Sequence, residues 1–187
     1  MDNRNMRYEV LPEIAAHWSP RAFDESRPVA EDDLLALFDA ARCAPSCFNE
    51  QPWRFIVARS PEPKQRLTAC LTERNQLWAG KAPVLLVILA KVNFSHNSKP
   101  NRWHAFDTGT AWGYLSLEAQ HRGLITHAMG GFSVEQVRTA FLVPEDYSIM
   151  TVVAIGYYGS KDNLHPQFVE KERPNPRNPI DEIVDLY

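Results

Sequence analysis

The sequence has few cysteines, and they form no pattern that would pair them or arrange them around a metal. Cys43, Cys47 and Cys70 are an odd set without a Cys-x-x-Cys pair or a closely spaced histidine pair. The six histidines are scattered and include no His-Glu-x-x-His arrangement. These absences argue against a disulfide framework and a zinc site, so we expect free thiols and no bound metal.

The sequence also lacks an excess of one charge and a long hydrophobic run. Its 20 basic and 23 acidic side chains give a net charge of -3, which provides no general attraction to nucleic acid or anionic lipid. The longest apolar run, residues 84–90, is far shorter than the roughly 20 residues that cross a bilayer. Residues 1–5 lack the apolar core of a signal peptide. We therefore expect a cytoplasmic protein with no nucleic-acid or membrane partner.

Three motifs of common enzyme classes are absent as well. No Gly-x-Gly-x-x-Gly follows a predicted strand, and no Gly-x4-Gly-Lys-[Ser/Thr] phosphate loop occurs. The Gly-x-Ser-x-Gly turn that carries the nucleophile of many hydrolases is also missing. Dinucleotide-binding folds, P-loop enzymes and serine hydrolases of these types thus lose their main support.

The hydrophobic pattern is typical of one globular domain in which helices and strands alternate. The 44% hydrophobic content of the 187 residues is enough for a sizeable core. Apolar periodicity and turn residues predict helices at 31–42, 64–77, 103–122 and 134–141, and strands at 53–58, 83–90, 124–129 and 149–157. The strand at 83–90 is apolar on successive residues, which predicts a central strand covered on both faces.

Two further features concern contact between subunits. Gly109 and Gly113 lie inside the predicted helix 103–122, where they would let another helix approach closely. That helix could belong to the same subunit or to a second copy. The segment 160–187 holds four prolines and few apolar residues. We expect it to be an extension of a single domain, residues 1–187, that wraps the partner subunit.

Two polar segments near the ends of the chain offer groups that suit a phosphate. Residues 17–23 place His17, Ser19 and Arg21 close together, and Arg has a planar fork that matches phosphate oxygens. Residues 173–179 hold Arg177 between prolines. The alternative for each segment is an ordinary solvated surface.

Two segments in the middle of the chain offer groups that suit a flat heterocycle. Asn49 and Gln51 lie on a loop braced by two prolines, which would fix their amide groups for hydrogen bonds. Gly130 and Gly131 lie between a strand and a helix, where the backbone can approach a ligand closely. Alternatively, Asn49 caps backbone groups and the glycines form a plain tight turn. All four segments together have the group types that flavin mononucleotide (FMN) requires.

In their order along the chain and in their residues, these segments resemble the nitroreductase family of flavoproteins over nearly the whole chain. The matching strings are Ser19-x-Arg21-x-Phe23, Ala44-Pro45-Ser46-x-x-Asn49-x-Gln51-Pro52-Trp53, Asp107-x-Gly109-x-Ala111, Gly123-Leu124, Gly130-Gly131-Phe132, Ala154-Ile155-Gly156-Tyr157 and Arg177-x-Pro179-Ile180-x-Glu182. The resemblance implies an α+β fold with a mixed central β-sheet flanked by helices. It also implies an intertwined homodimer with two FMN sites at the subunit interface.

The resemblance assigns the cofactor-binding residues in three groups. The group at the ribityl phosphate comprises His17, Trp18, Ser19, Arg21 and Arg177. The group on a loop that reaches the flavin of the other subunit comprises Pro45, Ser46, Cys47 and Asn49. The backbone donors to flavin N5 and O4 are Gly130 and Gly131.

The implied activity is that of an FMN-dependent oxidoreductase. It takes hydride from NADH or NADPH on flavin N5 and reduces a small acceptor such as a nitroaromatic or a quinone. No side chain is expected to be catalytic. The alternatives are a specialised flavoenzyme of the same family, acting by reductive dehalogenation or substrate dehydrogenation, and a non-catalytic FMN-binding protein.

Three departures from the family pattern bear on these expectations. His17 stands where many relatives have Arg, so the phosphate would gain only a partial charge near neutral pH. Gly130 stands where larger members often carry an acidic residue. The segment 91–103 is short, which omits the helical excursion that covers the site in larger relatives.

Overall fold

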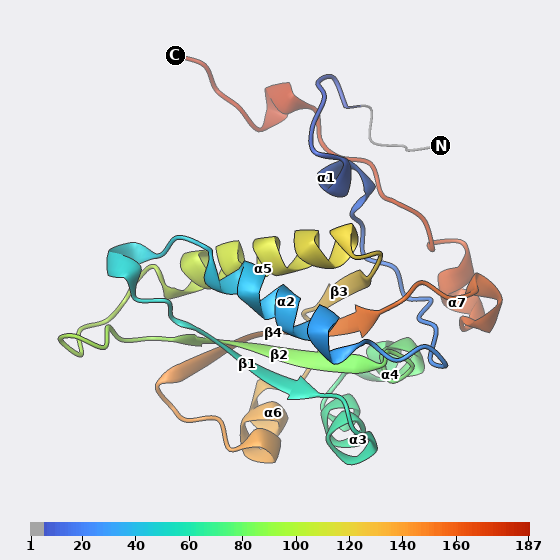
Figure 1. Ribbon diagram of the computed structural model, residues 1–187, viewed down its shortest axis with the longest axis horizontal. Helices are drawn as coiled ribbons and strands as arrows, with labels where there is room; N and C mark the ends of the chain where they lie inside the picture. The colour runs from blue at the N-terminus through green and yellow to red at the C-terminus, as the bar shows by residue number, and fades with distance from the viewer. Residues whose placement is uncertain (1–5) are drawn as a thin grey trace.

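The fold is built around one four-stranded sheet, seen in a computed structural model that describes residues 6–187 (Figure 1). The strands are β1 (Trp53–Ala58), β2 (Val84–Lys91), β3 (Ile125–Met129) and β4 (Tyr147–Gly156), in the spatial order β1-β2-β4-β3. Trp53 of β1 lies opposite Ala90 of β2, and the β2–β4 pairing shifts register between Ile88 and Leu89. The α+β class is confirmed.

One detail of the expected sheet is wrong for the single chain. All three strand pairings are antiparallel, whereas the resemblance implied a mixed sheet. β2 runs against both of its neighbours, β1 and β4, and β3 runs against β4. Within the described residues, no two neighbouring strands are parallel, so no crossover connection between parallel neighbours is needed.

The helices lie on both faces of this sheet. They are α1 (Pro12–Ala16), α2 (Glu31–Arg42), α3 (Pro61–Ala69), α4 (Glu73–Ala79), α5 (His104–His121), α6 (Val134–Phe141) and α7 (Pro166–Val169), with short 3-10 turns at Cys47–Asn49, Lys161–Asn163 and Ile180–Glu182. Most predicted bounds agree within two residues. The predicted helix 64–77 is instead two helices, α3 and α4. It breaks because residues 70–72 pair with 131–133, through the Leu71–Phe132 bridge and the bond from Thr72 N to Gly131 O.

Two cores form because successive residues of a strand face opposite sides of the sheet. Leu86 and Ile88 of β2 pack in one core with α2 and α5, whereas Leu85 and Val87 pack in the other with α3, α4 and α6. All four side chains are buried. β2 is therefore the central strand covered on both faces, as its sequence predicts.

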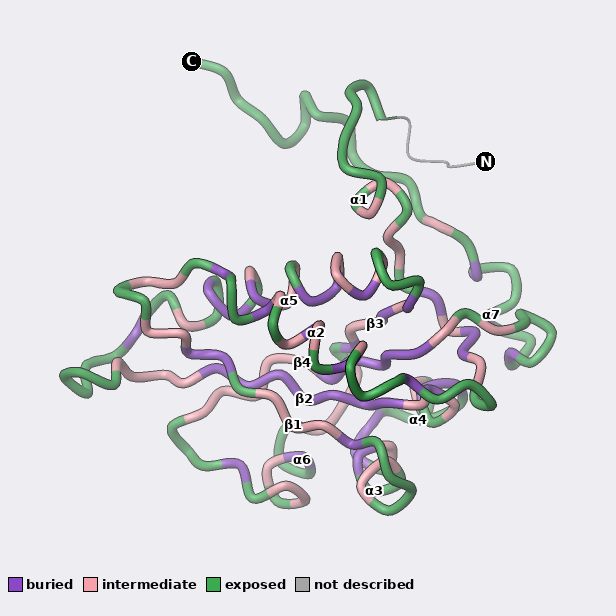
Figure 2. Tube along the Cα trace, viewed as in Figure 1, coloured by how far each residue is buried: buried purple, intermediate pink, exposed green. Residues whose placement is uncertain are grey.

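Both terminal segments extend beyond the sheet and the helices that cover its two faces, and they lie near one another (Figures 1 and 2). Residues 175–187 are exposed throughout, including Ile183 and Leu186 (Figure 2). Residues 1–5, which showed no signal-peptide core, lie outside the described residues. Among the described helices, none is both long and apolar enough to cross a membrane.

Candidate functional site

A small basic pocket lies where residues 18–21 meet the segment 171–177 beside β3. Its volume is about 240 Å³, and its lining residues are Trp18, Ser19, Arg21, His127, Lys171, Arg173, Asn175 and Arg177. Four of the eight carry positive charges. Four of the predicted phosphate residues thus lie together: Trp18, Ser19 and Arg21, and Arg177, which is more than 150 positions further along the chain.

The C-terminal side of this pocket is formed by alternate residues of one extended segment. Every second residue from 171 to 177 lines it. Pro174 and Pro176 fix their own φ near −65° and favour extended conformations in the residues before them. In an extended chain, alternate side chains project to the same side. Lys171, Arg173 and Asn175 were not predicted as site residues, although this alternation was visible in the sequence.

Arg21 is held from several directions. Its backbone N–H donates to Glu172 Oε1 at 2.7 Å, and its guanidinium Nη1 lies 4.0 Å from Glu172 Oε2. The guanidinium carbon lies 5.4 Å from the ring centre of Phe168 and 5.9 Å from that of Trp78. Burial lowers the pKa of Arg21 and so does nearby Arg74, while Glu172 opposes them. Arginine remains charged at physiological pH all the same, so the pocket keeps this cation.

His127 is a neutral member of the pocket. Burial lowers its pKa from 6.5 to about 4, and the charge of Arg21 acts in the same direction. Its Nδ1 lies 2.8 Å from the carbonyl oxygen of Pro20, so Nδ1 must carry the proton and donate it. In this tautomer Nε2 is a hydrogen-bond acceptor. No feature of the sequence distinguished His127 from an ordinary strand residue.

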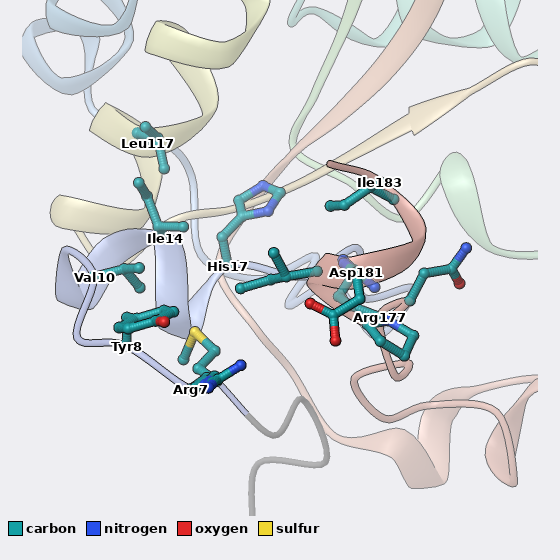
Figure 3. Close-up of a pocket in the computed structure, with 13 residues that line it drawn as sticks. Arg7, Tyr8, Val10, Ile14, His17, Leu117, Arg177, Asp181 and Ile183 are labelled. Atoms are coloured by element: carbon teal, nitrogen blue, oxygen red, sulfur yellow. The ribbon is translucent and has the colours of Figure 1, made fainter. Parts of the chain in front are cut away.

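His17 does not line the basic pocket, unlike its neighbours in the sequence. It faces a larger cavity of about 830 Å³ between the two terminal segments and α5 (Figure 3). His17 Nε2 lies 3.4 Å from Thr126 Oγ1. Mostly apolar side chains line this cavity, among them Tyr8, Leu117 and Ile183. Arg177 borders both spaces, so the cavity and the pocket adjoin.

The two glycines after β3 differ in their surroundings. A Cβ at Gly131 would lie 2.7 Å from Asn75 Nδ2 and 2.9 Å from Thr72 Oγ1, whereas one at Gly130 would meet nothing within 4 Å. The Gly131 carbonyl accepts hydrogen bonds from Thr72 N and Asn75 Nδ2. Gly131 therefore has a packing role, while the backbone at Gly130 is open to a ligand.

The loop 44–52 has a strained and exposed backbone. Phe48, Asn49 and Gln51 have φ values of 54°, 55° and 51°, in the left-handed region that non-glycine residues rarely adopt. Cys47 N donates to the buried carboxylate of Asp107 at 3.0 Å, and Gln51 N donates to Ser46 Oγ. These bonds hold the strained loop in place. The side chain of Phe48 nevertheless stands 82% exposed.

Within one chain, this loop does not meet the basic pocket. Cys47 is bonded to Asp107 in the first turn of α5, whereas Leu117 in its last turns borders the cavity that adjoins the pocket. Ten helical residues correspond to about 15 Å. Figure 1 accordingly shows the Cys47–Asn49 turn and α7 at opposite ends of α5. The predicted residues Pro45, Ser46, Cys47 and Asn49 are thus separated from Arg21 and Arg177.

Comparison with known proteins points to one family. The model of the nitroreductase family matches residues 14–73 and 69–157. A Ralstonia nicotianae protein, provisionally named as an NADH dehydrogenase/NAD(P)H nitroreductase, is 26% identical over 159 residues, which cover 75% of this chain and 80% of the relative. A crystal structure described as an oxidoreductase containing FMN is 35% identical, has a TM-score of 0.93, and aligns over 99% of this chain and 95% of its own.

The fold recurs at lower sequence identity. A nitroreductase family protein from Clostridium difficile aligns with a TM-score of 0.73 at 24% identity, over 95% of this chain and 98% of its own.

Proposed function

Because the chain belongs to the nitroreductase family, we propose that it is an FMN-dependent oxidoreductase that uses NADH or NADPH to reduce a small acceptor such as a nitroaromatic or a quinone. The structural relative described as containing FMN and the Ralstonia relative named for NAD(P)H support this proposal. Among the described residues, no group of three or more His, Cys, Asp or Glu side chains could hold a metal ion.

The observation that carries the proposal is the basic pocket. Arg21, Lys171, Arg173 and Arg177 give it four positive charges, and Ser19 adds a hydroxyl. A phosphate monoester carries close to two negative charges at neutral pH and has three acceptor oxygens, so the donor set fits such a group. The neutral Nε2 of His127 is an acceptor and suits a hydroxyl of the ribityl chain rather than the phosphate. The residues present therefore fit FMN.

The remaining predicted residues fit a site shared by two subunits. Gly130 offers open backbone at the end of β3, and the loop 44–52 lies too far along α5 to complete the same site within one chain. In a symmetric dimer, the loop of one subunit would approach the pocket of the other. We accordingly retain Pro45, Ser46, Cys47 and Asn49 as residues that contact the partner's flavin.

The exposed face of α5 supports a dimer. Apart from the adjacent residues and backbone of α5 itself, no described atom lies within 4 Å of a Cβ built at Gly109 or Gly113, so these glycines do not serve close packing with other described elements. Phe106, on the same face, is 72% exposed. An exposed aromatic side chain beside glycines with open space would allow a helix of another subunit to approach closely. We propose that a second copy covers it and that residues 160–187 extend across that copy from the single domain.

The protein's contribution to catalysis is binding and orientation. When bound, FMN supplies the redox chemistry, because it accepts hydride from a nicotinamide and gives up electrons to an acceptor. The cations around Arg21 would anchor the phosphate, and the backbone at Gly130 would orient the ring. No side chain in the described site is required as an acid or a base.

Flavin retention and reduction test this function. The purified protein is mixed with FMN, passed through a gel-filtration column and examined by visible spectroscopy before and after anaerobic addition of NADH or NADPH. We expect about one flavin per subunit, as one pocket per chain implies, and bleaching by a nicotinamide. Retained flavin that stays oxidised would indicate a non-catalytic FMN-binding protein, and failure to retain flavin would contradict the proposal.

A further inference from the structure

Glu172 is a buried carboxylate that contacts Arg21 of the basic pocket but does not itself line the pocket. Its side chain is 0% exposed, although it lies in the sequence between two pocket-lining cations, Lys171 and Arg173. A buried carboxylate is costly unless its charge is compensated by hydrogen bonds and opposite charges. Its presence beside a proposed phosphate site therefore requires a physical reason.

The two oxygens of Glu172 have different surroundings. Oε1 accepts hydrogen bonds from Arg21 N at 2.7 Å and Ala22 N at 2.9 Å. Oε2 is buried without a hydrogen-bond partner, and Arg21 Nη1 lies 4.0 Å from it. One carboxylate thus fastens both the backbone and the charged end of Arg21 to the C-terminal segment.

From this geometry we propose that Glu172 is a positioning residue, which joins the two segments of the basic pocket and holds the Arg21 guanidinium ready for a phosphate. The proposal rests on the assignment of the pocket to the FMN phosphate. Glu172 itself does not touch the ligand in this account. It acts through Arg21, and it keeps residues 171–177 against residues 18–22.

The positioning role and simple charge repulsion predict opposite changes in FMN affinity when the charge of Glu172 is removed. A negative charge beside a phosphate repels it, so removal of the charge alone would strengthen FMN binding. Loss of positioning would weaken FMN binding instead. Glu172→Gln is the discriminating change, because its amide oxygen can still accept from Arg21 N and Ala22 N while its neutral end no longer attracts the guanidinium.

The experiment compares the dissociation constants of FMN and riboflavin, which differ by the phosphate, for the wild type and for Glu172→Gln. We expect FMN to bind roughly tenfold more weakly to the variant and riboflavin to bind equally well, as a charge-assisted contact to phosphate implies. Glu170→Gln, a change at an exposed neighbouring residue, should alter neither value. Unchanged or tighter FMN binding, or equal weakening of both ligands, would overturn the proposal.

Two further variants keep the test decisive. In an Arg21→Ala background, Glu172→Gln should cause little additional loss, because residues that act through one another are not additive. A full second loss would contradict the proposal. If Glu172→Gln does not fold, Glu172→Asp retains the charge but shortens the side chain by one methylene, and it should lower the ratio of FMN to riboflavin affinity. An unchanged ratio would overturn the proposal.

Inorganic phosphate separates this proposal from the proposed function. If the wild type binds neither flavin, the function fails, but protection of the wild type against thermal unfolding by phosphate would still report on the pocket. We then expect Glu172→Gln to lose that protection and Glu170→Gln to keep it. Equal protection of all three proteins, or of none, would contradict a positioning role for Glu172.

Discussion

The basic pocket and the loop 44–52 are two halves of one predicted site, yet they are built in opposite ways. The pocket is preassembled within a chain: Glu172 ties Arg21 to the C-terminal segment, and Pro20 orients His127. The loop is anchored to α5 through Cys47, but its backbone is strained and Phe48 points into solvent.

This difference has a physical meaning. Hydrogen bonds at Glu172 Oε1 and His127 Nδ1 join the segments that form the pocket, so the structure of one chain is sufficient to form it. The loop keeps unfavourable dihedral angles, which hydrogen bonds at Cys47 and Gln51 hold in place, and it leaves the side chain of Phe48 exposed. A second subunit that binds against the loop would cover this side chain.

The largest expected effect concerns the preassembled half. The folded pKa of His127, about 4, is depressed below the unfolded value near 6.5, so the unfolded state binds more protons between these values. Stability should therefore be fully present above pH 6.5 and fall as the pH drops towards 4, by about 3 kcal/mol from this residue. Urea unfolding at several pH values, compared with His127→Gln, measures this contribution. Parallel pH profiles for the two proteins would contradict it.

Removal of the central cation should have an effect of similar size on binding. Arg21→Ala is expected to weaken FMN binding roughly a hundredfold, because a charge-assisted contact to phosphate is lost. Riboflavin affinity should change little. Arg42→Ala is the matched control, since Arg42 is exposed and pairs with Asp39 on α2. Fluorescence titration measures both ligands, and equal FMN affinity of Arg21→Ala and the wild type would remove the basic pocket from the site.

Smaller effects are expected at Gly130 and Gly131, where alanine should change FMN binding in one case and stability in the other. Gly131→Ala should destabilise the fold by about 2 kcal/mol, because the new methyl group overlaps Asn75 and Thr72. Gly130→Ala has free space in the chain and should leave stability unchanged while it weakens FMN binding. Thermal unfolding and FMN titration of both variants distinguish packing from ligand contact. If Gly130→Ala binds FMN normally, the backbone at this position does not approach the flavin.

The smallest expected effect concerns strain in the loop. Phe48→Gly and Leu142→Gly each relieve a left-handed conformation at a side chain that is 82% or 86% exposed, respectively. Each should stabilise the protein by about 0.5 kcal/mol, after allowance for the greater freedom of glycine when unfolded. Only Phe48→Gly should reduce acceptor turnover, since Leu142 merely ends α6. Equal turnover in the two variants would show that the strain at Phe48 has no function.

Local sequence signals predicted much of the fold. The successive apolar residues of 83–90 predicted the doubly covered β2, and apolar periodicity predicted α6 at 134–141. The break between α3 and α4 was missed because apolar periodicity continues through it. Its cause is a tertiary pairing with residues 131–133, which no local pattern contains.

The site residues likewise divide into those that sequence signals predicted and those that depend on tertiary contacts. Arg21 and Arg177 could be predicted because cationic residues beside hydroxyls and prolines suggest a phosphate, and the family resemblance joined them. Glu172 and His127 act through contacts that span 151 and 107 residues, respectively. Such contacts arise only once β3 and the C-terminal segment are folded against residues 18–22.

The most direct test of a site shared between subunits is complementation. Arg21→Ala and Asn49→Ala subunits, with different affinity tags, are co-expressed, and the doubly tagged dimers are isolated and assayed for FMN content and nicotinamide-dependent reduction. A site built from the pocket of one chain and the loop of the other leaves one intact site in each mixed dimer. The account predicts about half of the wild-type activity, although each variant alone is impaired. Mixed dimers no more active than the separate variants would contradict it.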